Sequence, residues 1–214
     1  MRLREGVTSG TLAPGAKLVG MRLATELGVS RITVANALKR LASEGFVMVT
    51  PHKEATVAEL SRARLDEIVA IRGALEEIAM RAAAAQVAPA ALARLRETNA
   101  ALDGAAAADD LPRYRALERA FHIGIYDASA LPITAALLTD LWDRLEPYRG
   151  RRYSTLGLAT TNHDEHGAII AALAARDAEA TAAAMRDHVG RGNDRLREAL
   201  VYADQGTLPP APLT

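Results

Sequence analysis

The sequence predicts a mostly α-helical protein, in which a small module of helices and a β-hairpin precedes an all-helical bundle. Three observations support this fold class. Hydrophobic residues make up 50% of the chain but aromatic residues only 4%, a composition typical of closely packed, alanine-rich helices. From residue 61 onward, apolar residues recur only at helical spacing. Two short strand-like runs, at residues 46–50 and 55–58, surround a polar tip and predict a hairpin.

The first 60 residues predict a helix, a tight turn and a second helix before the hairpin. A short amino-terminal helix is followed by a Pro-Gly turn at residues 14–15. The next helix ends at Gly28, because glycine tolerates the left-handed conformation that closes helices. Ser30 is a good N-cap for the following helix, which continues to Gly45. The apolar positions at helical spacing are Met21, Leu23, Ala24 and Leu27 before the turn, and Val34, Ala37, Leu38 and Leu41 after it.

The remainder of the chain predicts a helical bundle. A long amphipathic helix ends before Pro89, and its stripe consists of Leu65, Ile68, Ile71 or Arg72, Leu75 and Ile78. Further helices are expected at about residues 89–102, 111–128, 132–148, 161–175 and 177–202. The last residues hold three prolines and predict a loose tail. We therefore expect a first domain at residues 1–60, a helical domain at 61–203 and a tail at 204–214.

Composition excludes several classes of protein. The chain has no cysteine, which rules out disulfides and thiolate metal sites. No apolar run approaches the roughly 20 residues that span a bilayer, and residues 1–10 lack a signal-peptide core, so we expect a cytoplasmic protein with no membrane partner. The net charge is zero, but residues 1–60 carry eight Lys/Arg against five acidic residues, and the rest carry 18 against 21. This distribution favours a polyanionic partner for the first domain only.

The helix after the tight turn presents polar groups suited to DNA. With its apolar stripe turned inward, the residues left outward or on the flanks are Arg31, Thr33, Ala35, Asn36, Lys39 and Arg40. In the major groove, Arg reads guanine, Asn reads adenine and Lys holds phosphate. The alternative is a solvated face on an ordinary helical hairpin, since helical corners are common. The two strands that follow favour a winged helix-turn-helix that binds DNA.

These 60 residues resemble the GntR family of bacterial transcription regulators. The matching segments are S-G-T-L-A-P-G at residues 9–15, L-A-T-E-L-G-V-S-R at 23–31 and A-L-K-R-L-A-S-E-G at 37–45, followed by the hairpin. The resemblance implies that the turn and the second helix contact DNA bases and backbone, with the wing in the minor groove. The DNA-binding residues expected on this basis are Ser30, Arg31, Thr33, Asn36, Lys39, Arg40 and Lys53.

Two positions depart from the family pattern. The recognition helix usually continues as V-R-E-A-L, whereas this chain has Ala35 and Asn36 at the second and third of these positions. The wing usually carries a basic residue followed by glycine, whereas this chain has His52-Lys53-Glu54. An acidic side chain repels phosphate, and a missing glycine hinders close approach of the backbone. Two alternatives follow: an atypical operator read through Asn36, or weak DNA binding.

Four of the five histidines lie in the second domain. Glu118 and His122 are four residues apart, which places both side chains on one helical face. His166 and His188 begin and end two antiparallel helices, so they can meet across that hairpin. Three imidazoles and a carboxylate inside a helical bundle suit a divalent transition metal. The alternative is a set of surface or hydrogen-bonded core histidines; His163 is expected to be a solvated residue at the start of a helix.

From about residue 65 to 200 the chain resembles the FCD ligand-binding domain of the FadR subfamily. Metal-binding members show D-x-x-F-H, then E-H-x-x-I, then a late histidine; here these positions hold Glu118-Arg119-Ala120-Phe121-His122, Glu165-His166-Gly167-Ala168-Ile169 and His188. The resemblance implies that zinc, nickel or manganese is bound by Glu118, His122, His166 and His188, with Glu118 replacing the usual aspartate or asparagine. Open coordination positions would accept a small organic acid. Arg72 matches an arginine that commonly faces the ligand pocket in this family. The alternative interpretation is that Arg72 is a surface residue of the first long helix.

The combined prediction is a ligand-responsive transcription factor, a repressor that binds an inverted repeat in double-stranded DNA as a homodimer. Half-sites one DNA turn apart would be separated by roughly 34 Å. A metal-dependent hydrolase is an alternative, because the same histidines could activate water. However, Asp164 and Glu165 would point away from the helical face that holds His166. Such a hydrolase would therefore lack a general base. A metabolite-binding relative that has lost DNA recognition is a third possibility, suggested by Ala35 and Glu54.

Overall fold

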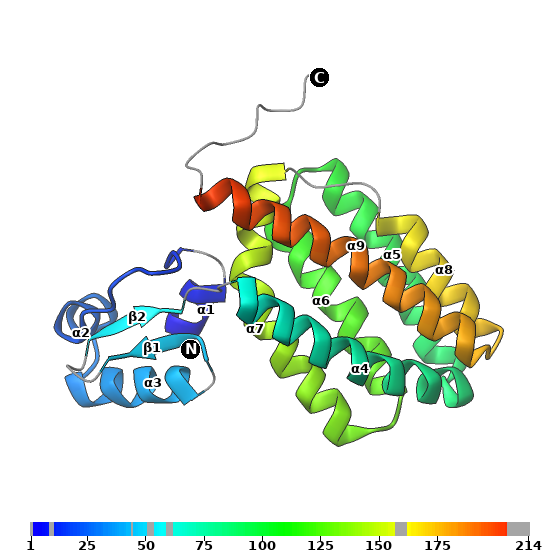
Figure 1. Ribbon diagram of the computed structural model, residues 1–214, viewed down its shortest axis with the longest axis horizontal. Helices are drawn as coiled ribbons and strands as arrows, with labels where there is room; N and C mark the ends of the chain where they lie inside the picture. The colour runs from blue at the N-terminus through cyan, green and yellow to red at the C-terminus, as the bar shows by residue number, and fades with distance from the viewer. Residues whose placement is uncertain are drawn as a thin grey trace. The chain divides into compact units, whose positions relative to one another are not determined.

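The structure is a computed structural model that describes residues 2–8, 11–43, 45–50, 54–58, 62–156 and 162–204 (Figure 1). The chain divides into two compact units, Met1–Ser61 with Asp143–Arg151, and Arg62–Trp142 with Arg152–Thr214. The predicted fold class, mostly helical with one small hairpin, is confirmed. In the described ranges, no helix combines the length and the apolar character needed to cross a membrane.

The first unit contains the tight turn predicted at Gly28. Its elements are α1 (Arg2–Thr8), α2 (Gly20–Leu27), α3 (Arg31–Ser43), β1 (Val47–Val49) and β2 (Ala55–Val57). Gly28 has a φ of 66°, and its N–H donates to the carbonyls of Ala24 and Thr25, which closes α2 as left-handed glycine caps do. The N–H of Thr33 donates to Ser30 Oγ at 3.1 Å, so Ser30 caps α3. Local capping thus ends α2 and starts α3 on either side of the tight turn.

The hairpin and one face of α3 share a small core. β1 and β2 are antiparallel, with Val47 opposite Val57 and Val49 opposite Ala55. Lys17 adds an isolated bridge to Thr56. The core is built from all the elements of this unit and includes Leu3, Val7, Leu23, Val34, Leu38, Leu41, Phe46 and Val57. Because one stripe of α3 packs against this core, its polar faces are left for solvent or for a partner.

The second unit is a bundle of helices. Its elements are α4 (Arg62–Gln86), α5 (Pro89–Ala107), α6 (Leu111–Ala128), α8 (Asn162–Ala174), α9 (Ala178–Asp204) and the part of α7 (Pro132–Leu156) that lies outside Asp143–Arg151. α9 packs along α4 and α8, and α5 packs along α6 and α8 (Figure 1). The core includes Met80, Phe121, Ile125, Leu138, Ile169, Leu173 and Met185. The predicted tail beyond Asp204 lies outside the described residues.

The buried face of α4 differs from the predicted apolar stripe. Ile71 and Ile78, two members of that stripe, are 47% and 52% exposed. The buried face runs instead through Leu65, Ile68, Arg72, Glu76, Ala79, Met80, Ala83 and Ala84. Arg72 and Glu76 are both buried because Arg72 Nη2 lies 2.7 Å from Glu76 Oε1, and paired charges tolerate burial that single charges do not. α4 therefore turns an ion pair toward the bundle interior and two isoleucines toward solvent.

Candidate metal centre and nucleic-acid interface

Four side chains with metal-binding atoms meet inside the helical unit. Glu118 and His122 come from α6, His166 from α8 and His188 from α9. Each is buried, with no more than 6% of the residue exposed, and one ligand atom from each lies within 4.8 Å of the others. The four-residue spacing on α6 aligns two of them, and the α8–α9 hairpin supplies the other two. Three imidazoles and one carboxylate form a donor set suited to a divalent transition metal.

The imidazole nitrogens approach one another closely enough to share an ion. His122 Nε2 and His188 Nε2 are 3.1 Å apart. Two nitrogens bound to one ion at about 2.1 Å, at a right angle, would be separated by about 3 Å. His166 Nε2 is buried and has no hydrogen-bond partner among the described residues. A buried nitrogen without a partner is rare, and an ion at this position would supply the missing interaction.

The environment of His166 keeps its ring neutral. Burial, followed by the charges of His188 and His163, lowers the pKa of His166 to about 2. A neutral imidazole retains the lone pair that a metal ligand needs. The ring stacks on Phe121 with 3.9 Å between the ring centroids. Phe121 directly precedes His122 on α6. This short segment therefore supplies one candidate ligand, His122, and orients the ring of a second, His166.

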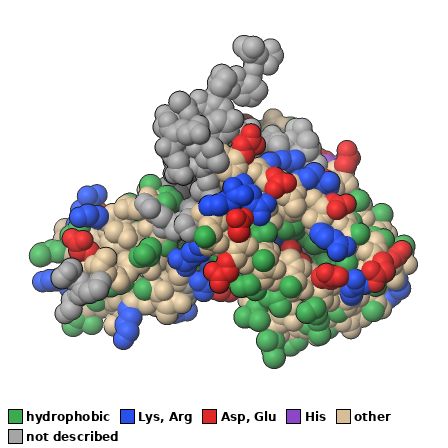
Figure 2. All heavy atoms as spheres, in the orientation of Figure 1, with side chains coloured by type: hydrophobic (Ala, Val, Ile, Leu, Met, Phe, Trp, Pro, Cys, Tyr) green, Lys and Arg blue, Asp and Glu red, His purple; other side chains and the backbone are tan. Residues whose placement is uncertain are grey.

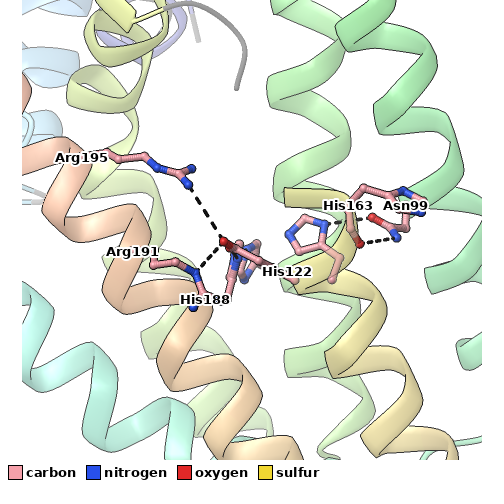
Figure 3. Close-up of polar contacts among 8 residues, drawn as sticks. Asn99, His122, His163, His188, Arg191 and Arg195 are labelled. Carbon is pink, nitrogen blue, oxygen red and sulfur yellow. Dashed lines mark hydrogen bonds and ion pairs between the residues drawn. The ribbon is translucent and has the colours of Figure 1, made fainter. Parts of the chain in front are cut away.

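Two polar side chains that the sequence analysis did not assign to the site hold the imidazoles from outside. His188 Nδ1 lies 2.7 Å from Glu165 Oε2, and His166 Nδ1 lies 3.1 Å from Asn99 Oδ1. In Figure 3, Asn99 lies on one side of the imidazoles, and Arg191 lies on the other. Glu165 precedes His166 on α8, but its side chain contacts His188, which lies on α9. No spacing rule links Asn99 to His166, because 67 residues separate them.

His163 lies outside this cluster. Its side chain is 46% exposed, and its Nδ1 is 2.7 Å from Asp103 Oδ2. Its backbone carbonyl accepts a hydrogen bond of 3.2 Å from Asn99 Nδ2. His163 therefore belongs to the first turn of α8 and does not supply a ligand atom to the cluster.

Arg72 is buried near the cluster, and its charge is already paired. In addition to its ion pair with Glu76, Arg72 Nη2 donates to the Tyr126 hydroxyl at 3.2 Å, and that hydroxyl donates to Glu76 Oε1 at 2.6 Å. Burial raises the pKa of Tyr126, so the hydroxyl remains a donor at neutral pH. Arg72 Nε is buried and has no partner among the described residues. One N–H of the guanidinium is thus left to donate to a ligand oxygen.

Trp142 connects Arg72 to the cluster. The guanidinium carbon of Arg72 lies 5.0 Å from the centroid of the Trp142 ring, within the range of a cation–π interaction. The ring centroids of Trp142 and His122 are 4.3 Å apart. Trp142 was not predicted to lie at the site, although a lone tryptophan in a chain with few aromatic residues was a usable signal. Arg72, Trp142 and His122 therefore form a continuous series of contacts inside the bundle.

A pocket of about 260 Å³ lies between α4 and α9. Its lining includes Gly73, Glu76, Met185, Val189 and Asn193. Glu76 therefore faces this pocket and also pairs with Arg72.

The first unit exposes most of the residues predicted to contact DNA. The exposed residues at and within α3 include Ser30, Arg31, Thr33, Asn36, Lys39 and Arg40. Ser30 Oγ and Thr33 Oγ1 are 2.8 Å apart, so these two hydroxyls also form the helix cap. Ile32 is 74% exposed and was missed because apolar residues are usually assigned to a core. An exposed isoleucine beside Arg31 can contact the methyl group of thymine.

The wing is described only in part. His52 and Lys53, at its predicted tip, lie outside the described residues. Glu54 is exposed, and its Oε1 lies 3.7 Å from Lys17 Nζ. The N–H of Thr50 donates to the carbonyl of Glu54 at 2.9 Å. Lys17 partly offsets the acidic charge of Glu54, although solvent screens a pair this exposed.

Comparisons with known proteins agree with both units. The bacterial gntR regulatory protein family matches residues 1–57, and the FCD domain matches residues 67–191. The HTH-type transcriptional regulator McbR of Escherichia coli K12 is 34% identical over 179 residues, which cover 83% of this chain and 81% of McbR. The Nta operon transcriptional regulator of Aminobacter aminovorans is 27% identical over 189 residues, 87% of each chain. The solved structure of E. coli McbR matches with a TM-score of 0.83 and 30% identity, over 93% of this chain and 95% of that one.

Proposed function

The chain belongs to the GntR family of bacterial transcriptional regulators and carries an FCD domain, and from this premise we propose that it is a repressor that senses a small organic acid at a metal centre. Its relatives are transcriptional regulators rather than enzymes, so the hydrolase alternative is not retained. The observation that carries the proposal is the convergence of Glu118, His122, His166 and His188 in the buried interior of the bundle.

The four residues would hold one zinc, nickel or manganese ion. The unpartnered Nε2 of His166 and the short separation of the His122 and His188 Nε2 atoms support this donor set. When bound, the ion would supply open coordination positions for the oxygens of an organic acid, because three imidazoles and one carboxylate do not complete an octahedral shell. The longer Glu118, in place of aspartate, would bring its carboxylate to the same point from α6.

Arg72 would contribute to effector binding through its remaining donor. Its Nε has no partner among the described residues, whereas its Nη2 is bonded to Glu76 and Tyr126. An effector oxygen near Trp142 could accept from Nε without breaking the Arg72–Glu76 pair. Charge-assisted hydrogen bonds of this kind are stronger than neutral ones. Recognition of the acid would therefore be shared between the ion and Arg72.

The first unit would bind double-stranded DNA. We propose residues 1–60 as the DNA-binding domain and residues 61–203 as the effector domain. Arg31, Ile32 and Asn36 would contact base edges, Lys39, Arg40 and Lys53 would contact phosphates, and Ser30 and Thr33 would fix the helix start. Because a regulator of this kind acts on bacterial DNA, we also propose a cytoplasmic location.

A homodimer would present two recognition helices to an inverted repeat with half-sites roughly 34 Å apart. Exposed aliphatic side chains on the helical unit offer surface for a second copy: Ile71 and Ile78 on α4, and Ile133 and Leu137 on α7. In Figure 2, hydrophobic side chains gather over these two helices, while basic and acidic side chains are mixed over α9. Exposed aliphatic side chains of this size favour association where they gather into one patch.

Effector and operator would be coupled through the two units. An acid that binds the helical domain more tightly in one arrangement would shift the DNA-binding domains away from the operator, and DNA would reduce the affinity for the acid by the same factor. The repressor assignment requires that the acid releases DNA rather than promoting its binding.

The proposal is tested by fluorescence anisotropy of the purified, metal-analysed protein with DNA from upstream of its own gene. Scrambled DNA at the same salt concentration serves as the control. We expect binding at least about a thousandfold tighter to the upstream fragment, and release by one member of a panel of small carboxylic acids. Effector binding without sequence-specific DNA binding, even after selection from random sequences, would favour the alternative of a metabolite-binding relative. Ala35, exposed on α3 where the family carries arginine, is the observation that favours it.

A further inference from the structure

We infer that Glu165 and Asn99 are positioning residues of the candidate metal centre, each holding one imidazole with its Nε2 toward the ion. The inference rests on the proposed function, because it requires an ion at the four-residue cluster. Neither residue offers a ligand atom to that cluster. Both act on the Nδ1 atom of a histidine that does.

Glu165 fixes the tautomer and the ring orientation of His188. At 2.7 Å, the Nδ1–H of His188 donates to Glu165 Oε2, which leaves the lone pair on Nε2, where His122 Nε2 also points. A carboxylate behind a histidine makes that histidine a more basic metal ligand.

Glu165 is itself held from the solvent side. Arg191 Nε lies 2.6 Å from Glu165 Oε1, and Arg195 Nη2 lies 3.9 Å from the same oxygen; both arginines reach it from α9 (Figure 3). Only 11% of the Glu165 side chain is exposed, against 50% for Arg191. Arg191 therefore anchors Oε1 and leaves Oε2 for His188. A chain of contacts runs from the surface of α9 to the ion-binding nitrogen.

Asn99 performs the same task for His166 with a neutral group. The Nδ1–H of His166 donates to Asn99 Oδ1 at 3.1 Å, and Asn99 Nδ2 donates to the backbone carbonyl of His163. The second bond fixes which end of the amide faces the imidazole. Asn99 is only 5% exposed, so its two bonds lie in the interior. His166 Nε2 is thereby left without a proton and directed at the cluster.

The test measures metal affinity in the full-length chain. Zn²⁺ is titrated against a chromophoric chelator, and Co²⁺ is used for its visible spectrum, which reports ligand geometry. The variants are Glu165→Ala, Glu165→Gln, Asn99→Ala and, as the matched control, Asp164→Ala, an exposed acid one residue before Glu165. We expect a loss of about 10- to 100-fold in Zn²⁺ affinity for Glu165→Ala and Asn99→Ala, and wild-type affinity for Asp164→Ala.

The conservative variant separates positioning from a structural role. Glu165→Gln retains an oxygen that accepts from His188 Nδ1, so we expect it to restore the wild-type Co²⁺ spectrum with an affinity between those of wild type and Glu165→Ala. Circular dichroism and unfolding of the metal-free variants confirm that the bundle is intact. Affinity in Glu165→Ala and Asn99→Ala equal to that of Asp164→Ala would overturn this inference alone. Absence of metal binding by the wild type would overturn the metal centre and the inference together.

Discussion

His122 and His188 meet through their Nε2 atoms at 3.1 Å, although 66 residues separate them in the chain. Both rings are buried, so the two nitrogens are not separated by bulk solvent. Two imidazole nitrogens at this distance share either a proton or an ion, because neutral rings expose one lone pair each and lone pairs repel. The ring contact between Trp142 and His122 and the hydrogen bond that His188 Nδ1–H donates to Glu165 hold the pair in this arrangement.

Replacing His188 by alanine is expected to abolish metal binding while the protein stays folded. One of three imidazoles is lost from the donor set, and His122 loses the nitrogen opposite it. Metal content after dialysis and circular dichroism measure the two effects. His163→Ala is the matched control, since His163 is a histidine on the first turn of α8 outside the cluster. Equal metal content in His188→Ala and wild type would contradict the site assignment.

The metal-free protein is expected to lose stability as the pH falls below about 6.5. The pKa of His166 is about 2 in the folded state, against an ordinary value of 6.5. Between these values the unfolded chain binds a proton that the folded chain does not, so the free energy of unfolding rises with pH, by up to about 1.4 kcal/mol per unit. Urea unfolding between about pH 5 and 7 measures this slope. His166→Asn removes the titrating group, and an unchanged slope in that variant would refute the assignment.

Replacing Glu76 by alanine is expected to destabilise the bundle by about 3–5 kcal/mol, because it leaves the guanidinium of Arg72 buried without its counterion. The pair is 2% and 4% exposed at its two side chains, so solvent cannot substitute for the lost carboxylate. Urea unfolding at neutral pH gives the difference. Glu77→Ala provides the comparison, because Glu77 forms an exposed pair with Arg81 on the same helix. Similar destabilisation in both variants would contradict the buried role of Glu76.

Two substitutions on α3 are expected to weaken DNA binding in different ways. Lys39→Ala should lower affinity for all sequences and reduce the salt dependence by about one counterion, since Lys39 would contact phosphate. Asn36→Ala should reduce discrimination between operator and scrambled DNA by about 1–3 kcal/mol, since Asn36 would read a base. Anisotropy titrations at several salt concentrations separate the effects. Arg96→Ala, an exposed arginine on α5, should change neither quantity; identical behaviour of all three variants would argue against recognition by α3.

The proposed homodimer is expected to dissociate into monomers in the Ile78→Glu variant. A charge at an exposed apolar position of α4 would be desolvated if a second copy covered it. Sedimentation velocity reports the oligomeric state, and affinity for an inverted repeat should fall with it. Ala90→Glu, at an exposed position of α5, should leave the wild-type state unchanged. A wild-type oligomer in the Ile78→Glu variant would exclude this face of α4 from the interface.

The sequence by itself was sufficient for features that short-range geometry controls. Gly28 and Ser30 predicted the turn between α2 and α3, because a left-handed glycine and a hydroxyl cap act within a few residues. The four-residue separation of Glu118 and His122 required a shared face on α6. The fold class also followed from the pattern, since helical spacing beyond residue 61 left no place for strands.

Only the tertiary structure decided which polar groups lie inside the bundle. Periodicity favoured Ile78 over Glu76 for the buried face of α4, yet Glu76 is buried because Arg72 and Tyr126 satisfy its charge. The roles of Glu165 and Asn99 depend in the same way on partners carried by other helices. Capping and helical spacing are properties of a continuous segment of chain. The burial of a charge is determined by the group that packing brings against it, and that group lies far away in the sequence.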